Sequence, residues 1–225
     1  MKVLIYGATG MVGQAVLREC LLDPEVTLVL TVGRSASGRS HPKLAELVQP
    51  DLSNYPHSSQ ELRGFDACFF CLGVSSGDVT EAQYVRLTYD LTVAVAELLA
   101  SLNPNMTFVY VSGTGTDSSE RGRVMWARVK GKTENAIARL FPKAYMFRPG
   151  AIEPMHGEVS KTKAYRLIYK FAKPVLSILR RAAPQWVIGT EDVGRAMIQV
   201  AKKGWPKRIL ENTDIRDCAR AWASK

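Results

Sequence analysis

The sequence predicts a doubly wound α/β fold, in which a mostly parallel sheet carries helices on both faces. Apolar segments of about five to seven residues alternate with longer segments of helical spacing. This alternation favours strands that are joined by helices, and therefore a parallel sheet. The apolar segments are also nearly continuous, as expected for strands that are buried on both faces.

Six strands and three long helices account for most of the first 150 residues. The expected strands cover residues 2–7, 27–33, 46–52, 65–73, 106–113 and 143–150. The expected helices cover residues 10–20, 79–102 and 125–141. Because 225 residues are enough for one α/β domain but few for two, we expect a single domain over residues 1–225.

The composition is that of a soluble globular protein, with 46% hydrophobic and 23% charged residues. No run of eighteen apolar residues occurs, which argues against a membrane-spanning helix. The first residues, MKVLIYG, lead into a glycine turn rather than a cleavage site, so they predict a buried strand and not a signal peptide. We therefore expect a cytoplasmic protein.

Cys68 and Cys71 have the spacing of a redox or zinc motif. They fall within the expected strand 65–73, where residues three apart point to opposite faces of the sheet. No second cysteine pair or paired histidine completes a zinc site. We expect both cysteines to pack as small apolar side chains, and we expect no metal site.

The net charge of +9 is concentrated in the last third of the chain. Residues 1–150 contain 15 Lys and Arg against 14 Asp and Glu, whereas residues 151–225 contain 15 against 7. This distribution argues against a generally basic protein that binds nucleic acid, and for one local basic feature.

The segment GATGMVG places glycines at positions 7, 10 and 13, between the first strand and the first helix. Gly7 allows a tight turn, Gly10 allows a close approach of the backbone to a pyrophosphate, and Gly13 allows the helix to pack against the strand. The helix N-terminus contributes free N–H groups and the positive end of its dipole. The sequence therefore predicts a Rossmann-type dinucleotide site, with a cofactor-binding core at 1–150 and a substrate-side extension at 151–225.

Arg34 follows the second strand, where an acidic residue would bind the adenosine ribose of NAD. No acidic residue occurs between Glu25 and Glu46. A guanidinium suits the 2′-phosphate of NADP by its charge and its bidentate geometry, so NADP(H) is favoured over NAD(H). Arg39 is a weaker second candidate.

These motifs resemble the atypical branch of the short-chain dehydrogenase/reductase superfamily. The stretches YVRLTYDLTVAVAELL and VKGKTE are similar to those of the Tat-interacting-protein-like oxidoreductases, near the NAD-dependent epimerases. The expected cofactor-binding residues are Gly7, Thr9, Gly10, Met11, Val12, Gly13, Arg34, Asp51, Leu52, Cys71, Leu72, Gly73, Lys130 and Arg148.

The resemblance implies catalysis by a serine on the fifth strand and a Tyr-x-x-x-Lys motif on the next helix. Ser112 matches the serine and Lys130 matches the lysine, but Trp126 occupies the tyrosine position. An indole N–H donates a hydrogen bond but is not a usable acid near neutral pH. Alternative proton donors are Tyr89, Tyr165, Tyr169, or Ser112 with a water, and His156 is the histidine best placed near a substrate.

Between Glu158 and Glu191 the chain contains no acidic residue, and apolar and basic residues alternate at helical spacing, interrupted at Pro174. One interpretation is a lid helix over the substrate pocket. Another is peripheral attachment of residues 160–181 to an anionic membrane. No base-reading motif accompanies the charge, so we expect no nucleic-acid partner.

Three functional hypotheses follow from the sequence. The first is an NADP-dependent oxidoreductase that acts on a small carbonyl compound or alcohol, with Ser112 polarising the oxygen and Lys130 holding the ribose. The second is an NADP(H)-binding sensor that has lost turnover, which Trp126 favours. The third is an epimerase or dehydratase that uses the bound cofactor transiently.

Overall fold

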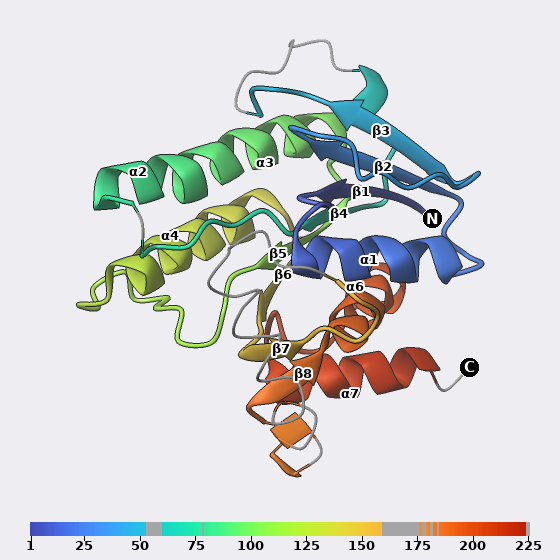
Figure 1. Cartoon of the computed structure of the whole chain (residues 1–225). Coiled ribbons are helices and arrows are strands. Elements are labelled where there is room, and N and C mark those ends of the chain that lie inside the picture. The colour runs from blue at the N-terminus through green and yellow to red at the C-terminus, as the bar shows by residue number, and fades with distance from the viewer. Residues whose placement is uncertain are drawn as a thin grey trace.

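The computed structural model describes residues 1–52, 60–77, 79–158, 176, 179–180, 182–183 and 185–223. Within these residues, seven parallel strands form one sheet in the order β3-β2-β1-β4-β5-β6-β9 (Figure 1). The strands are β1 (Lys2–Tyr6), β2 (Leu28–Gly33), β3 (Leu44–Val48), β4 (Ala67–Phe70), β5 (Thr107–Val111), β6 (Lys143–Arg148) and β9 (Ile209–Glu211). Two further strands, β7 (Ala151–Glu153) and β8 (Val187–Gly189), form a separate parallel pair.

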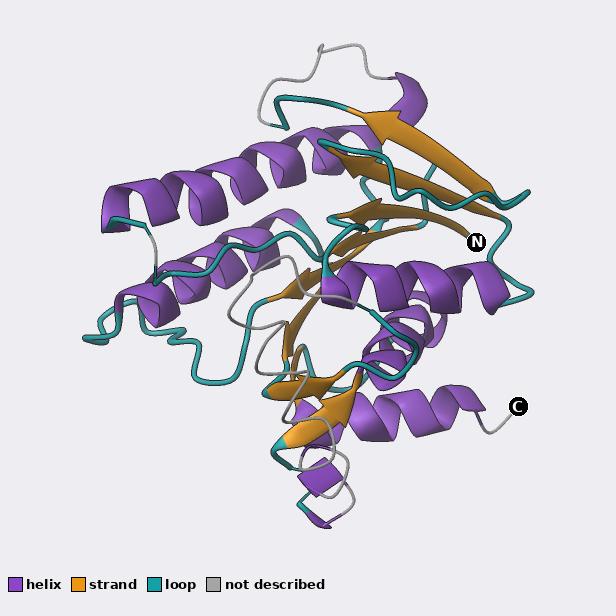
Figure 2. Cartoon of the chain, in the orientation of Figure 1, coloured by secondary structure: helices purple, strands orange, loops and turns teal. Residues whose placement is uncertain are grey.

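Helices cover both faces of the sheet, as Figure 2 shows. The long helices are α1 (Met11–Leu22), α3 (Leu91–Leu102), α4 (Met125–Leu140), α6 (Thr190–Lys203) and α7 (Asn212–Ala223). Three shorter elements are the 3₁₀ turn η1 (Gln60–Leu62), the helix α2 (Glu81–Val85) and the π-helical turn η2 (Arg86–Asp90). Of the helices in the described part of the chain, none is both long and apolar enough to cross a membrane.

The sheet reverses its order beside β1. The chain moves from β1 to β2 and β3 on one side, and then returns to place β4 on the other side of β1. The crevice beyond the carboxyl ends of strands at such a reversal is the usual ligand site of a doubly wound sheet. In this chain the reversal brings the turn after β1 next to the loop after β4.

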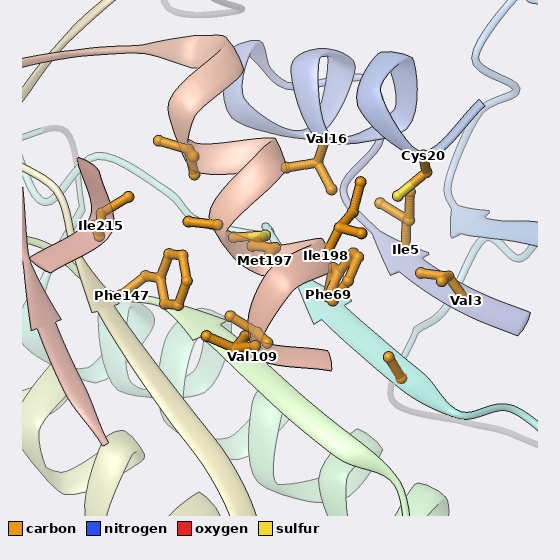
Figure 3. Packing of buried hydrophobic residues seen from close by; sticks show 14 of the residues in the cluster. Val3, Ile5, Val16, Cys20, Phe69, Val109, Phe147, Met197, Ile198 and Ile215 are labelled. Carbon is orange, nitrogen blue, oxygen red and sulfur yellow. The ribbon is translucent and has the colours of Figure 1, made fainter. Parts of the chain in front are cut away.

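The core consists of two apolar layers, one on each face of the sheet. Val3 and Ile5 of β1 contact the layer that includes α1, α6 and α7, whereas Leu4 and Tyr6 contact the layer that includes α3 and α4. This alternation follows from the period of two along a strand. Figure 3 shows the first layer, in which Met197 of α6 lies among side chains of the sheet and of α1.

The predicted doubly wound parallel sheet is confirmed, and the first, second, fifth and sixth strands lie at or within the expected bounds. The third strand is present, but its expected bounds, 46–52, are wrong. β3 begins at Leu44, which pairs with Val29 of β2, and it ends at Val48. Pro50 has no N–H to continue the ladder, so Asp51 and Leu52 lie beyond the strand instead of closing it.

Other differences arise in short or distorted segments. The fourth strand covers only Ala67–Phe70, so residues 71–73 belong to the loop that follows it. The expected helix 79–102 is divided by the π-helical turn η2. β9 was not predicted because three residues after a basic loop show no strand pattern of their own, but it pairs with Met146–Arg148.

We expect Met197→Ala to destabilise the protein by about 2–5 kcal/mol, because the Met197 side chain is fully buried in the first layer and its removal leaves a cavity. The free energy of unfolding in urea is the measurement. Lys203→Ala, an exposed position on the same helix, is the control and should change it by less than about 0.5 kcal/mol. Equal effects at the two positions would contradict this packing.

Candidate functional site

The turn between β1 and α1 is closed by contacts that leave no space for side chains. Gly7 has φ +82°, and a Cβ added to it would lie 2.9 Å from the backbone of Cys71 and Leu72. A Cβ added to Gly13 would lie only 2.1 Å from the carbonyl oxygen of Gly7. The same oxygen accepts a hydrogen bond from the Gly10 N–H at 3.0 Å. The first turn of α1 therefore lies directly against the end of β1.

The N-terminus of α1 has the properties of an anion site. Its first turn contains no acidic residue, and its N-cap residue, Gly10, has no side chain that could accept from the first N–H groups. The first N–H groups of a helix have no partner within the helix, and they lie at the positive end of its dipole. Met11 and Val12 are half-buried, and both pack against the first apolar layer. The Thr9 carbonyl accepts from the Gln14 side chain, which fixes the turn.

Arg34 is exposed directly after β2, so it lies at the carboxyl ends of the strands, as the glycine turn does. Within the described part of the chain it forms no ion pair. Glu46 of β3 accepts hydrogen bonds from the Thr31 hydroxyl at 3.0 Å and from the Ser37 N–H at 2.7 Å. The loop after β2 therefore begins with the exposed guanidinium of Arg34. The Glu46 carboxylate already accepts hydrogen bonds from Thr31 and Ser37.

The remaining expected cofactor residues flank this turn. Asp51 is exposed, whereas Leu52 is buried in the second layer, so its side chain packs in the core. Gly73 is exposed, and among the described residues nothing lies within 4 Å of a Cβ added to it. The Cys71 N–H donates to the Tyr6 carbonyl, which holds the loop after β4 beside the glycine turn.

The two cysteines of the CxxC segment pack on opposite faces of the sheet, as predicted. Cys68 belongs to the second layer and Cys71 contacts the first. Burial raises the pKa of the Cys71 thiol to about 12, which keeps it protonated near neutral pH. All four cysteines are free thiols.

A buried carboxylate connects the three elements on the other side of the crevice. Glu134 of α4 is 2% exposed, and one of its oxygens accepts from the Ser112 hydroxyl at 2.5 Å. The same carboxylate accepts from Arg148 Nε at 3.0 Å and also pairs with the Nη2 of Arg148. Arg148 Nη2 donates in addition to the Ser118 hydroxyl. Glu134 therefore links the ends of β5 and β6 to α4, and its hydrogen bond raises the pKa of Arg148.

Lys130 lies one helical turn before Glu134, on the same face of α4. Its ammonium donates to the carbonyl oxygen of Ser112. Burial lowers the pKa of Lys130 to about 8, although the negative charge of Glu134 opposes this shift. The amine is therefore a group that gains and loses a proton close to neutral pH.

Trp126 lies one turn before Lys130, so that residues 126, 130 and 134 form a row along α4. The indole ring is half-buried and lies against the backbone at Gly115, where a Cβ would be 3.6 Å from its Cη2 atom. The spacing of the Tyr-x-x-x-Lys motif was visible in the sequence. Glu134 continues the same spacing, but the sequence alone does not predict its role, because its partner Arg148 lies 14 residues further along the chain.

The alternative proton donors are placed less favourably or not described. The Tyr89 ring lies under the ammonium of Lys132, 4.2 Å from the ring centroid. Lys132 is two residues from Lys130 and therefore on the opposite side of α4. His156 Nε2 is 3.0 Å from a carboxylate oxygen of Glu191. Tyr165, Tyr169 and most of the basic segment 160–181 lie outside the described residues.

Known proteins resemble this chain in sequence and in fold. Protein fmp52, mitochondrial, of Emericella nidulans is 25% identical over 211 residues, which cover 90% of this chain and 88% of the relative. Protein HTATIP2 of Rattus norvegicus is 30% identical over 159 residues, 67% of this chain and 62% of the relative. The solved structure of UDP-glucuronic acid 4-epimerase from Bacillus cereus in complex with NAD has a TM-score of 0.69 and 12% identity, covering 93% of this chain and 77% of that one.

The relatives correct the expected cytoplasmic location. The Emericella nidulans protein and further fungal relatives are named mitochondrial. The expectation rested on the lack of a signal-peptide pattern and of a long apolar run, and neither feature identifies the compartment.

The sequence also matches a model of the NAD dependent epimerase/dehydratase family over residues 3–120. The matched segment contains the glycine turn, the crevice beside β1 and the end of β5 with Ser112. The resemblance to the short-chain dehydrogenase/reductase superfamily is thereby confirmed. The chain belongs to the NAD dependent epimerase/dehydratase family.

Proposed function

We propose that the chain is an NADP(H)-dependent oxidoreductase that acts on a small carbonyl compound or alcohol. The observation that carries this proposal is the glycine turn, where residue 13 has no space for a side chain and the helix N-terminus carries no acidic residue. Such a turn fits the pyrophosphate of a dinucleotide, which binds through backbone N–H groups. The Bacillus cereus epimerase, which is similar in fold, is described as a complex with NAD, and this supports the assignment.

Arg34 supports a preference for NADP(H). It is exposed at the carboxyl end of β2, where the adenosine ribose of a dinucleotide binds in this fold. The 2′-phosphate of NADP carries negative charge and accepts bidentate hydrogen bonds from a guanidinium. NAD has only hydroxyl groups at this position and gains less from Arg34.

The bound dinucleotide supplies or accepts a hydride, and the residues of this chain act on the substrate oxygen and its proton. The Ser112 hydroxyl has one hydrogen, which it donates to Glu134 or to the Phe147 carbonyl, so in this arrangement it has no further hydrogen to donate to a substrate oxygen. Lys130 has a pKa of about 8 because it is buried, and its ammonium has two further hydrogens beyond the one donated to Ser112. We assign the proton transfer to Lys130 and the binding of the cofactor ribose to the same amine.

A second candidate function is an NADP(H)-binding sensor without turnover, and Trp126 is the observation that favours it. The indole occupies the position of the tyrosine acid, in the same row of α4 as Lys130 and Glu134, and it lies against Gly115. An epimerase or dehydratase reaction is compatible with membership of the family. It would need the same cofactor site and the same movement of a proton.

Arg34→Gln should weaken NADPH binding about tenfold or more and leave NADH binding within about threefold, because it removes a charge-assisted contact to the 2′-phosphate. Fluorescence titration of both reduced coenzymes is the measurement. Arg63→Gln removes the same charge and serves as the control, because Arg63 is exposed and precedes β4, at the amino ends of the strands. Tighter binding of NADH than of NADPH by the native protein would contradict the preference.

The rate of NADPH-dependent carbonyl reduction should fall as the pH rises through about 8, because Lys130 then loses the proton that it donates. Glu134→Gln should move this fall to lower pH, since the negative charge of Glu134 stabilises the ammonium. The pH dependence of kcat is the measurement, with Glu97→Gln, an exposed position on α3, as the control. An identical pH profile in Glu134→Gln would exclude Lys130 as the proton donor.

Trp126→Tyr should raise kcat for carbonyl reduction by about 10²–10⁴-fold, because it adds a phenol one turn from Lys130. Trp126→Phe keeps an aromatic ring without a hydroxyl and should leave kcat within a few-fold of the native value. Coenzyme oxidation with a panel of aldehydes and ketones is the measurement. Turnover by the tyrosine variant alone would establish the sensor as the native function and contradict the oxidoreductase.

A further inference from the structure

The connection between the parallel strands β2 and β3 contains no helix. Residues 34–43, all of which the structure describes, lead from the carboxyl end of β2 to the amino end of β3. Such a crossover is usually an α-helix, whose own hydrogen bonds fix its backbone. Here the chain crosses with a turn at Gly38, which has φ +75°, and with Pro42 near its end. The course of this connection, which begins at Arg34, therefore depends on contacts to other elements.

The Glu46 carboxylate of β3 joins the middle of this connection to the sheet. One of its oxygens, Oε2, accepts from the Ser37 N–H at 2.7 Å and from the Thr31 hydroxyl at 3.0 Å. Thr31 is 4% exposed and is the residue of β2 directly opposite Glu46 in the parallel ladder. The Ser37 hydroxyl in turn accepts from the Arg39 N–H at 3.2 Å. A single carboxylate oxygen thus holds the connection where it folds back along β2 and β3.

Glu46 acts on this connection from a position below the end of the sheet. It is opposite Thr31, whereas Gly33, the last residue of β2, is opposite Val48. Each strand residue advances by about 3.3 Å, so Glu46 lies about 7 Å before the carboxyl end of β2. A 2′-phosphate at Arg34 would bind beyond that end, and salt largely screens two exposed charges that are more than about 8 Å apart. The hydrogen bond to Ser37 is therefore the main effect of Glu46 on such a phosphate.

We propose that Glu46 is a positioning residue for coenzyme specificity, which holds Ser37 so that Arg34 stays at the 2′-phosphate of NADP(H). This inference rests on the proposed NADP(H) dependence and adds to it a residue of another strand. Arg34 is exposed, so the course of the backbone, rather than side-chain packing, sets its position. The backbone is fixed before Arg34 by β2 and three residues after it by the Ser37 N–H. NAD has no 2′-phosphate, so its binding gains little from this arrangement.

Glu46→Ala removes the acceptor of both hydrogen bonds, and it should weaken NADPH binding about fivefold while NADH binding changes less than about twofold. The effect is modest because Glu46 is exposed and water competes for its oxygen. Glu46→Gln keeps one side-chain oxygen that can accept from both donors, so NADPH affinity should stay within about twofold of the native value. Fluorescence titration of both coenzymes is the measurement. Glu97→Ala makes the same change at an exposed position on α3 and is the control.

A double variant shows whether Glu46 acts through Arg34. The protein with both Arg34→Gln and Glu46→Ala should bind NADPH within about twofold of Arg34→Gln alone, because two changes to one interaction are not additive. A further fivefold loss in the double variant would overturn the proposal. Tighter NADPH binding by both Glu46→Ala and Glu46→Gln would also overturn it, since Glu46 would then act as a repelling charge. So would an equal loss of NADPH and NADH affinity in Glu46→Ala, which is the result of a merely structural role.

Hydrogen–deuterium exchange without coenzyme tests the anchor separately from the function. The Ser37 amide should exchange faster in Glu46→Ala than in Glu46→Gln or in the native protein, because it loses its acceptor. Equal exchange in the three proteins would overturn the anchor. A native protein that does not prefer NADPH would contradict the proposed function itself. A native preference that Arg34→Gln abolishes and Glu46→Ala leaves unchanged would overturn only the role of Glu46.

Discussion

The cofactor side of the molecule depends on one steric constraint, which is the contact between the first turn of α1 and the carbonyl of Gly7. Gly13 has no Cβ, and any Cβ at this position would lie only 2.1 Å from the carbonyl oxygen of Gly7. Gly7 in turn lies against the backbone of residues 71 and 72, so β1, α1 and the loop after β4 meet at one point. This contact places the first N–H groups of α1 at the crevice where the strand order reverses.

The opposite side of the crevice depends on electrostatics. Glu134 is a buried anion between Arg148, which is paired with it, and Lys130, whose ammonium it stabilises. A buried carboxylate is stable only with such partners, so removal of either partner is costly. The Ser112 hydroxyl donates to Glu134 and the Lys130 ammonium donates to the Ser112 carbonyl, so these contacts fix Ser112 and Lys130 relative to each other. The proposed proton transfer by Lys130 is a consequence of this placement.

The sheet and the glycine turn were predictable because local sequence patterns specify both. Apolar runs indicate the strands, and the glycine spacing indicates the turn. β9 and the exact position of β3 were not predictable in this way. Leu44 enters β3 through pairing with Val29, and Ile209 enters β9 through pairing with Met146, and both pairings join distant residues. The role of Glu134 was hidden for the same reason, although its spacing from Lys130 was a usable sign.

The most direct test of the central claim is hydrogen–deuterium exchange of the full chain with and without saturating NADPH. The proposed function predicts slower exchange of the amides at residues 11–13 and of the segment that begins at Arg34, since these groups would contact the pyrophosphate and the 2′-phosphate. Unchanged exchange in both segments, with NADPH bound elsewhere or not bound, would contradict it.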